Sequence, residues 1–224
     1  MSEYQEFRVA YELTSAILCF ILVRFMIKPY RLTSDGRYLG LPIAFGLLGA
    51  SYLFSSVIYT ELPFFRQDFL WFQLVARTFA FMFLAATYYF SIKPSETSRL
   101  LWNVTFSLIT VAIVTSVVAV IFMPQFNFES YRTASQYVRI FIIICLIYII
   151  IHVLRSHMAK PDSTTLLIPL GYILLAIGQY SLIIWALDGS MSAWWGALAL
   201  RWGGLAIFLY IAYVTFYGSQ KKGK

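Results

Sequence analysis

The sequence predicts an all-α integral membrane protein, a compact bundle of seven transmembrane helices. Composition is the first reason: of 224 residues, 60% are hydrophobic and 12% are charged, whereas soluble domains have about 25% charged residues. The second reason is that apolar residues form seven continuous runs, each near the ~20 residues that cross a bilayer. Strands of a membrane barrel would instead alternate in polarity over ~10 residues, so helices are expected. The composition excludes a disordered chain, a disulfide scaffold and a nucleic-acid-binding domain.

The first four spans follow from the apolar runs and from the residues that interrupt them. Lys28, at the end of the first run, and Lys93, after the third, are each followed by proline. Lysine complements the negative end of a helix dipole and proline cannot continue a helix, so both places predict a helix end. Pro42 lies near the start of the second run, where proline is tolerated. The expected spans are 9–27, 39–60, 68–91 and 100–123.

The last three spans are bounded in the same way. Lys160 is followed by proline after the fifth run. Thr164 and Thr165 then provide hydroxyl groups that can cap the sixth helix, and Pro169 lies near its start. The expected spans are 132–155, 165–187 and 193–217. Because the connections between spans are short, the chain 1–224 is expected to form a single domain.

Charge placement predicts the orientation in the membrane, because the side richer in lysine and arginine is usually cytoplasmic. The N-terminal tail and the loops on its side hold Arg8, Arg66 and Arg132. The side with the C-terminus holds ten basic residues: Lys28, Arg31, Arg37, Lys93, Arg99, Arg155, Lys160, Lys221, Lys222 and Lys224. We therefore expect a multi-pass protein of the cell membrane with its N-terminus outside and its C-terminus cytoplasmic.

Charged residues inside the spans are the most informative feature of the sequence. Arg77, Arg139 and Arg201 occur in the third, fifth and seventh spans and are separated by 62 residues twice. Each lies about two to three turns from the outer end of its span. Equal spacing at matching depth predicts an internal repeat built on helix hairpins. A charge inside the bilayer costs at least a few kcal/mol, so it usually faces protein or water and has a partner.

We expect these arginines to converge on a ligand site in the outer half of the bundle. Gln73 and Gln136 lie one turn before Arg77 and Arg139, and residues three or four apart share a helix face. Guanidinium groups match carboxylate and phosphate geometrically, which predicts a small anionic or lipidic ligand. The predicted ligand-binding residues are Arg77, Arg139, Arg201, Glu12, Gln73, Gln136 and Gln179.

A structural alternative gives these arginines no ligand. Each guanidinium could snorkel to the outer interface, or bond an acid or an exposed helix carbonyl, and so serve only to hold helices together. The acids considered as partners are Glu12, Glu61 and Asp188. The sequence leaves both interpretations open.

Two further patterns predict how the helices sit in the membrane and pack. Aromatic residues near span ends are typical of the belts at membrane interfaces. Glycines in the sixth and seventh spans, including Gly171 and Gly204, predict close approach of these helices. The expected belt residues are Trp71, Tyr131, Trp194 and Trp195 at the outer side and Trp102 and Tyr38 at the inner side.

No cofactor, metal or catalytic centre is expected. Covalent retinal needs a lysine inside the membrane, and every lysine lies in a predicted loop or tail. His152 and His157 lie on one helix, five residues apart, so they do not face each other across a haem. Zinc motifs, phosphate-binding loops and an assignable Ser-His-Asp set are missing, so the chain is not expected to be an enzyme.

Three functions remain open at this level. The first is a receptor-like or sensory protein that binds its ligand in the outer half of the bundle and signals through a membrane protein partner. The second is a non-catalytic accessory subunit of a larger membrane complex. The third is a small-solute transporter, which predicts broken helices and polar groups at the midplane. The lipid bilayer is an expected partner in every case, and nucleic acid is expected in none.

Overall fold

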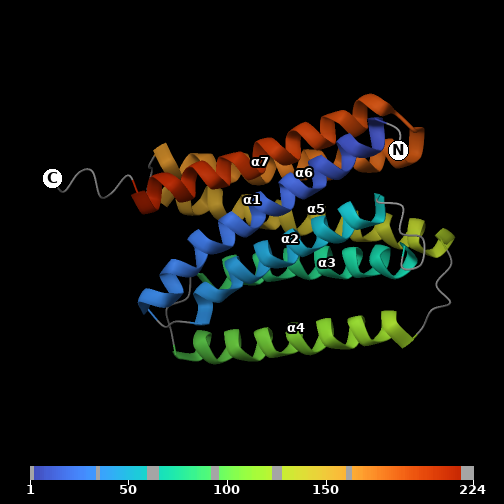
Figure 1. Cartoon of the computed structure of the whole chain (residues 1–224). Coiled ribbons are helices and arrows are strands. Elements are labelled where there is room, and N and C mark those ends of the chain that lie inside the picture. Colours follow the sequence, from blue (N-terminus) through green and yellow to red (C-terminus); the bar gives the residue numbers. More distant parts are fainter. Residues whose placement is uncertain are drawn as a thin grey trace.

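The computed structural model describes residues 3–33, 36–59, 66–91, 96–122, 128–159 and 163–217. This part of the chain forms seven α-helices and one short 3-10 helix, η1 (Gly36–Leu39). Figure 1 shows the α-helices lying side by side along a common direction. Their bounds are α1 (Glu3–Thr33), α2 (Gly40–Tyr59), α3 (Arg66–Ser91), α4 (Glu96–Phe122), α5 (Phe128–Ala159), α6 (Ser163–Asp188) and α7 (Met191–Tyr217).

The prediction of seven helices long and apolar enough to cross a membrane is confirmed within the described residues. The first predicted helix is too short: α1 begins at Glu3 rather than near residue 9, and it does not end at Lys28 but continues through Pro29 to Thr33. Proline has a fixed φ that is compatible with a helix, although it lacks the backbone donor and its ring crowds the carbonyl four residues earlier. The turn after it is still helical, and the Thr33 hydroxyl donates to the Pro29 carbonyl at 2.9 Å. The lysine-proline pairs at 93–94 and 160–161 lie outside the described residues.

Helices α1, α2, α3, α5, α6 and α7 pack in this order into a closed ring, because α7 also packs against α1. We call these helices the helix ring. Helix α4 lies outside the ring, where it packs against α3 and η1, and Figure 1 shows it at the edge of the bundle. The bundle therefore consists of a ring and one peripheral helix.

The two ends of the described chain lie at opposite ends of the bundle (Figure 1). We call the half nearer to the start of α1 the outer half and the other the inner half, after the predicted orientation. That orientation stays a prediction. The internal repeat also stays a prediction. The three helices that carry the equally spaced arginines do not have equivalent neighbours: α3 and α5 pack against each other, whereas α7 packs against α6 and α1.

The inner half of the helix ring is filled by apolar side chains. Leu22, Leu84 and Leu146, on α1, α3 and α5, are fully buried and belong to one hydrophobic cluster. Helices α6 and α7 approach closely there: a Cβ added to Gly204 would lie 2.9 Å from the carbonyl oxygen of Gly171. The predicted close contact of these helices is therefore present, since small residues let backbones meet.

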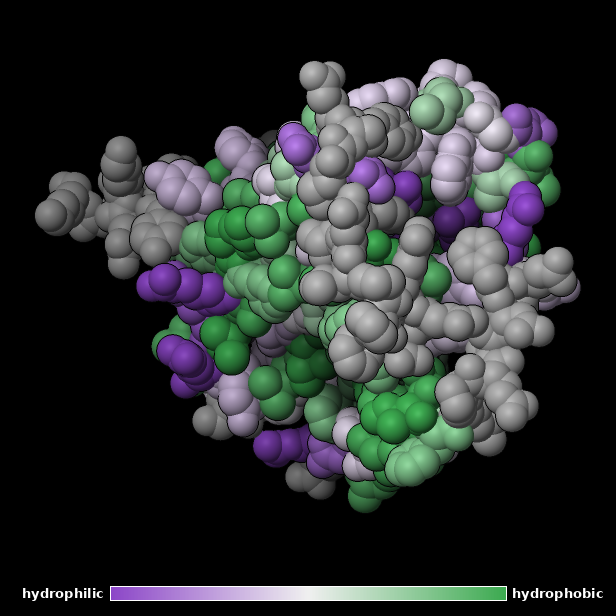
Figure 2. Space-filling model, turned by 45° about the vertical axis from the view of Figure 1, so that its right-hand side comes forward, coloured by the Kyte–Doolittle hydropathy of each residue, from purple (hydrophilic) through white to green (hydrophobic). Residues whose placement is uncertain are grey.

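Apolar side chains also cover the outside of the bundle. In Figure 2, hydrophobic side chains occupy the flank of the molecule and hydrophilic ones gather towards its ends. On α4, Leu108 and Val111 are 65% and 63% exposed. Such large exposed apolar surfaces are rare on soluble proteins, and together with the lengths of the helices they suggest a multi-pass membrane protein.

Candidate functional site

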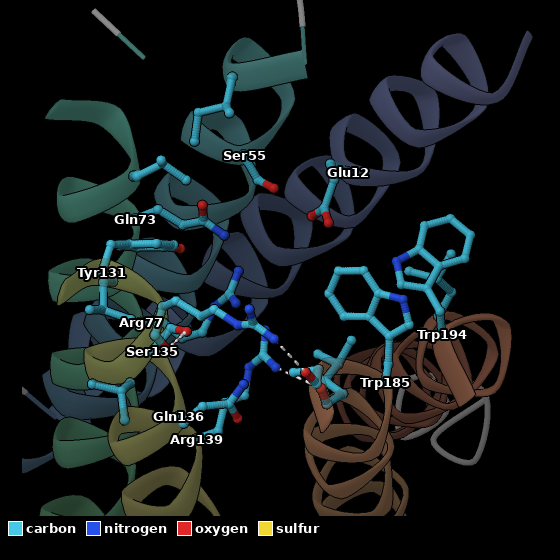
Figure 3. Close-up of a pocket in the computed structure, with 18 of the residues that line it drawn as sticks. Glu12, Ser55, Gln73, Arg77, Tyr131, Ser135, Gln136, Arg139, Trp185 and Trp194 are labelled. Atoms are coloured by element: carbon cyan, nitrogen blue, oxygen red, sulfur yellow. Dashed lines mark hydrogen bonds between the residues drawn. The ribbon is translucent and has the colours of Figure 1, made fainter. Parts of the chain in front are cut away.

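The outer half of the helix ring contains a cavity of about 550 Å³. Each helix of the ring contributes to its lining, and among the described residues none on α4 does. Figure 3 shows two sides that face each other across the cavity. One side, on α3 and α5, carries Gln73, Arg77, Gln136 and Arg139, which we call the polar wall. The other, on α6 and α7, carries the indole rings of Trp185 and Trp194, which we call the aromatic wall.

The structure brings most of the predicted site residues together. All three predicted arginines line the cavity, and so do Glu12 and the glutamines of the polar wall. The exception is Gln179, which is 7% exposed but is not among the described lining residues. Its depth in the sixth span predicts a place in the site, but depth does not determine the direction in which a side chain points. The ligand-binding role of the whole set stays a prediction.

Arg201 has an internal counter-ion. Its Nη1 atom donates to Oε2 of Glu12 at 2.9 Å, and both side chains are almost fully buried. The rings of Tyr11 and Tyr52 flank the guanidinium, with centroids 5.3 and 4.8 Å from Cζ. The Tyr11 hydroxyl also donates to the carbonyl of Leu198. Arg201 thus ties α7 to α1, as the structural alternative expects.

Arg77 is in a different situation. It is 9% exposed, and its Nε atom donates to the hydroxyl of Ser51 at 3.3 Å. Its Cζ atom lies 5.6 Å from the ring centroid of Tyr52, the same ring that flanks Arg201. Its Nη2 atom is buried and has no hydrogen-bond partner among the described residues. The charge of Arg77 is therefore placed at a cavity wall, with one buried guanidinium nitrogen that has no partner among the described residues.

Arg139 and Arg132 join α5 to α6. Arg139 Nη1 donates to the carbonyl oxygen of Leu182 at 2.7 Å, and Arg132 Nη2 donates to that of Ala186 at 3.1 Å. Ala186 lies in the last turn of α6, where carbonyls lack intrahelical partners and favour cations. The structural alternative is therefore right about helix carbonyls for Arg139, although this residue also lines the cavity.

The cavity includes residues that the sequence pattern assigns to other places. Arg8 and Arg132 are expected as charges of the tail and of a loop, but they lie on α1 and α5 and line the cavity. The belt prediction is wrong for Trp194, which is 2% exposed and lies beneath the guanidinium of Arg8, 5.7 Å from its Cζ. Helical spacing could have placed Arg8 and Trp194 in the site. Arg8 precedes Glu12 by four residues and Trp194 precedes Arg201 by seven, so each pair lies on one helix face.

Positive charge exceeds negative charge in the described lining. Arg8 and Arg132 add to the three predicted arginines, whereas Glu12 is the one carboxylate among the described lining residues. Charges interact more strongly in a space partly removed from water than in bulk water. The described lining therefore carries more formal positive than negative charge.

The described residues contain no group of three or more histidine, cysteine or acidic side chains that could hold a metal ion. Cys19 and Cys145 are both free and buried. Comparison of the chain with family models, with curated proteins and with solved structures finds no match. A function for this chain therefore has to be inferred from the chemistry of the cavity.

Proposed function

We propose that this chain is a receptor-like protein of the cell membrane that binds a small anionic or lipidic ligand in the cavity of its outer half. The observation that carries the proposal is the unused Nη2 donor of Arg77, buried at the wall of a cavity rich in arginine. An oxygen atom of the ligand supplies the missing acceptor.

The incomplete pairing of Arg77 has an energetic cost. A buried donor without a partner costs about 1–3 kcal/mol, and more when the group is charged. An arginine with a purely structural role is expected to be matched inside the protein, as Arg201 is by Glu12. Arg77 has the Ser51 hydroxyl at 3.3 Å, a long hydrogen bond. The contrast between these two arginines supports a ligand at Arg77.

The proposed orientation places this cavity on the outer side of the membrane. It follows from the excess of lysine and arginine that the sequence assigns to the C-terminal tail and to the loops on its side. The ligand then reaches the site from the external solution or from the outer leaflet, and a membrane protein partner relays its binding to the cytoplasm.

A second candidate function, an accessory subunit of a membrane complex, has support from α4. This helix packs against α3 and η1 alone among the described elements and exposes apolar side chains along its length. Such a helix can pack against another membrane protein as well as against lipid. Purification from its native membrane as a stable complex of defined stoichiometry would favour this second function.

Thermal unfolding with three kinds of anion tests the proposed ligand site. The purified protein is heated with sodium phosphate, with sodium 1-naphthoate, and in nanodiscs that contain phosphatidylglycerol or only phosphatidylcholine. At least one anion should raise the midpoint of the original protein and not that of Arg77→Gln. Arg24→Gln is the matched control, because Arg24 is also an arginine within a span but is not among the described lining residues.

Two results contradict the proposal. One is that no anion raises the unfolding midpoint of the original protein. The other is that the original protein, Arg77→Gln and Arg24→Gln respond equally, since the effect would then come from general ion binding.

The orientation has a separate test. A reporter fused after Lys224 should be active in the cytoplasm, and a cysteine placed in the segment 124–131 should react with a reagent that does not cross the membrane. Reaction of a cysteine in the segment 155–164 from outside would show that the orientation is the reverse.

A further inference from the structure

We infer that the ligand is an amphipathic anion, with one anionic group at the polar wall and a flat apolar body against the aromatic wall. This inference rests on the proposed function and adds the chemical class of the ligand. The facing arrangement of Arg77 and Arg139 with Trp185 and Trp194 in Figure 3 is its starting point.

The size of the cavity excludes a bare inorganic anion as a sufficient occupant. Ligand pockets for organic molecules measure about 300–1,000 Å³, and this cavity measures about 550 Å³. A small inorganic anion takes only a few times the ~30 Å³ share of one water molecule. Most of the cavity would then hold water against indole rings and leucine side chains.

The contacts of the arginines favour a single anionic group over several. Arg201 is matched by Glu12, so its charge is already compensated. Arg139 donates one nitrogen to the carbonyl of Leu182. Arg77 provides the buried Nη2 donor, which has no partner among the described residues. Gln136, also on the polar wall, has a buried Oε1 atom without such a partner, but this atom is an acceptor and would bind a donor group of the ligand rather than its anionic oxygens. Among the described lining residues, Arg77 Nη2 is therefore the buried donor without a partner, and it matches one carboxylate or phosphate group.

The opposite wall is lined mainly by aromatic and aliphatic side chains. Trp185 packs against a small hydrophobic cluster that contains Trp194, Leu182 and Leu198. Aromatic rings prefer offset-stacked or edge-to-face contacts, which contribute about 0.5–1.5 kcal/mol beyond the area that they bury. The guanidinium of Arg8 lies over the ring of Trp194 and holds it in place at the wall. Trp185, which is half-buried, is therefore the ring on this side that a flat apolar body can contact, with Trp194 packed behind it.

A matched pair of carboxylates measures the contribution of the apolar body. Binding of sodium 1-naphthoate and of sodium acetate to the purified protein is compared by calorimetry, with pyrophosphate as a polyanion. We expect 1-naphthoate to bind at least about tenfold more tightly than acetate or pyrophosphate. Trp185→Leu should remove most of this preference, and Trp195→Leu should keep it, because Trp195 is 45% exposed and is not among the described lining residues.

The outcomes separate this inference from the proposed function. If pyrophosphate or acetate binds as tightly as 1-naphthoate, or if Trp185→Leu keeps the preference, the amphipathic class is wrong. The proposed function still holds in that case if Arg77→Gln weakens the binding of these anions. If Arg77→Gln leaves the binding of every anion unchanged, the proposed function fails first and this inference fails with it.

A competition experiment distinguishes the two sources of an amphipathic anion. Binding of 1-naphthoate is measured in nanodiscs of phosphatidylcholine alone and with added phosphatidylglycerol. Competition by the anionic lipid supports the inference with a lipid as the source. Unchanged binding supports it with a soluble organic anion as the source.

Discussion

The outer and inner halves of the helix ring are built by the same helices but are filled in opposite ways. In the outer half, Arg77, Arg201 and Glu12 surround a cavity. In the inner half, Leu84 and Leu205 continue α3 and α7 and are fully buried in the apolar cluster. On α3 and α7 the change from polar, cavity-lining residues to buried apolar residues occurs within about two turns. The inner half therefore stabilises the fold by packing, whereas the polar groups of the outer half need partners.

The difference between the halves shows what the polar residues contribute. Inside lipid, helices associate through close packing, and small residues such as Gly171 and Gly204 favour it in the inner half. The cavity of the outer half lacks such packing and keeps two buried cations, Arg77 and Arg201, which cost free energy unless they are paired. Residues that cost stability are expected at functional sites, so substitutions in the two halves should differ in their effects on stability and on binding.

The largest effect is expected for the buried ion pair of the outer half. Glu12→Gln or Arg201→Gln alone should lower the free energy of unfolding by about 3–5 kcal/mol, because each leaves one buried charge without its partner. The double variant should lose less than the sum of the two changes. Denaturant unfolding in detergent measures all three variants. Additive losses would mean that the two side chains do not act as a pair.

The next effect belongs to the packed inner half. Leu146→Ala should lower the free energy of unfolding by about 2–5 kcal/mol, because Leu146 is fully buried and a cavity is left behind. Binding of 1-naphthoate to the folded protein should not change. Ile144→Ala on the same helix is the control, since Ile144 is 59% exposed, and it should cost far less. Loss of binding in folded Leu146→Ala would show that the two halves are coupled.

A smaller effect on stability, with a large effect on binding, is expected for Arg77. Without anion, Arg77→Gln should change the free energy of unfolding by less than about 1 kcal/mol, because removal of an incompletely paired charge offsets the lost contact with Ser51. With anion at about 100 times its Kd, the original protein gains about 2.7 kcal/mol by mass action. The variant should lack this gain, and unfolding curves with and without 1-naphthoate measure it. A large destabilisation without anion would indicate a structural role.

The smallest effect is expected at the exposed rim of the cavity. Arg132 is exposed, and its contact with the Ala186 carbonyl at 3.1 Å is accessible to water. Arg132→Gln should change stability by less than about 1 kcal/mol. It should weaken anion binding a few-fold at low salt, and this difference should shrink near 0.5 M salt because exposed charges are screened. A loss that does not depend on salt would place Arg132 in the same class as Arg77.

The sequence by itself determined the helices and the depth of their charges. Hydropathy acts over ~20 consecutive residues and needs no knowledge of neighbours, so the seven spans could be predicted. Counting residues from the predicted outer end of each span also placed Arg77, Arg139 and Arg201 near the outer ends of their helices. Proline was a weaker signal, since α1 continues through Pro29.

Only the tertiary structure decided which side chains meet. Glu12 and Arg201 are 189 residues apart, and their pairing depends on the closure of the ring by α1 and α7. Gln179 lies at a suitable depth but is not among the described lining residues, whereas Trp194, expected at the interface, forms part of the cavity wall. The physical reason is that hydropathy sets how deep a residue lies, while packing against specific neighbours sets the rotation of each helix and its place in the ring.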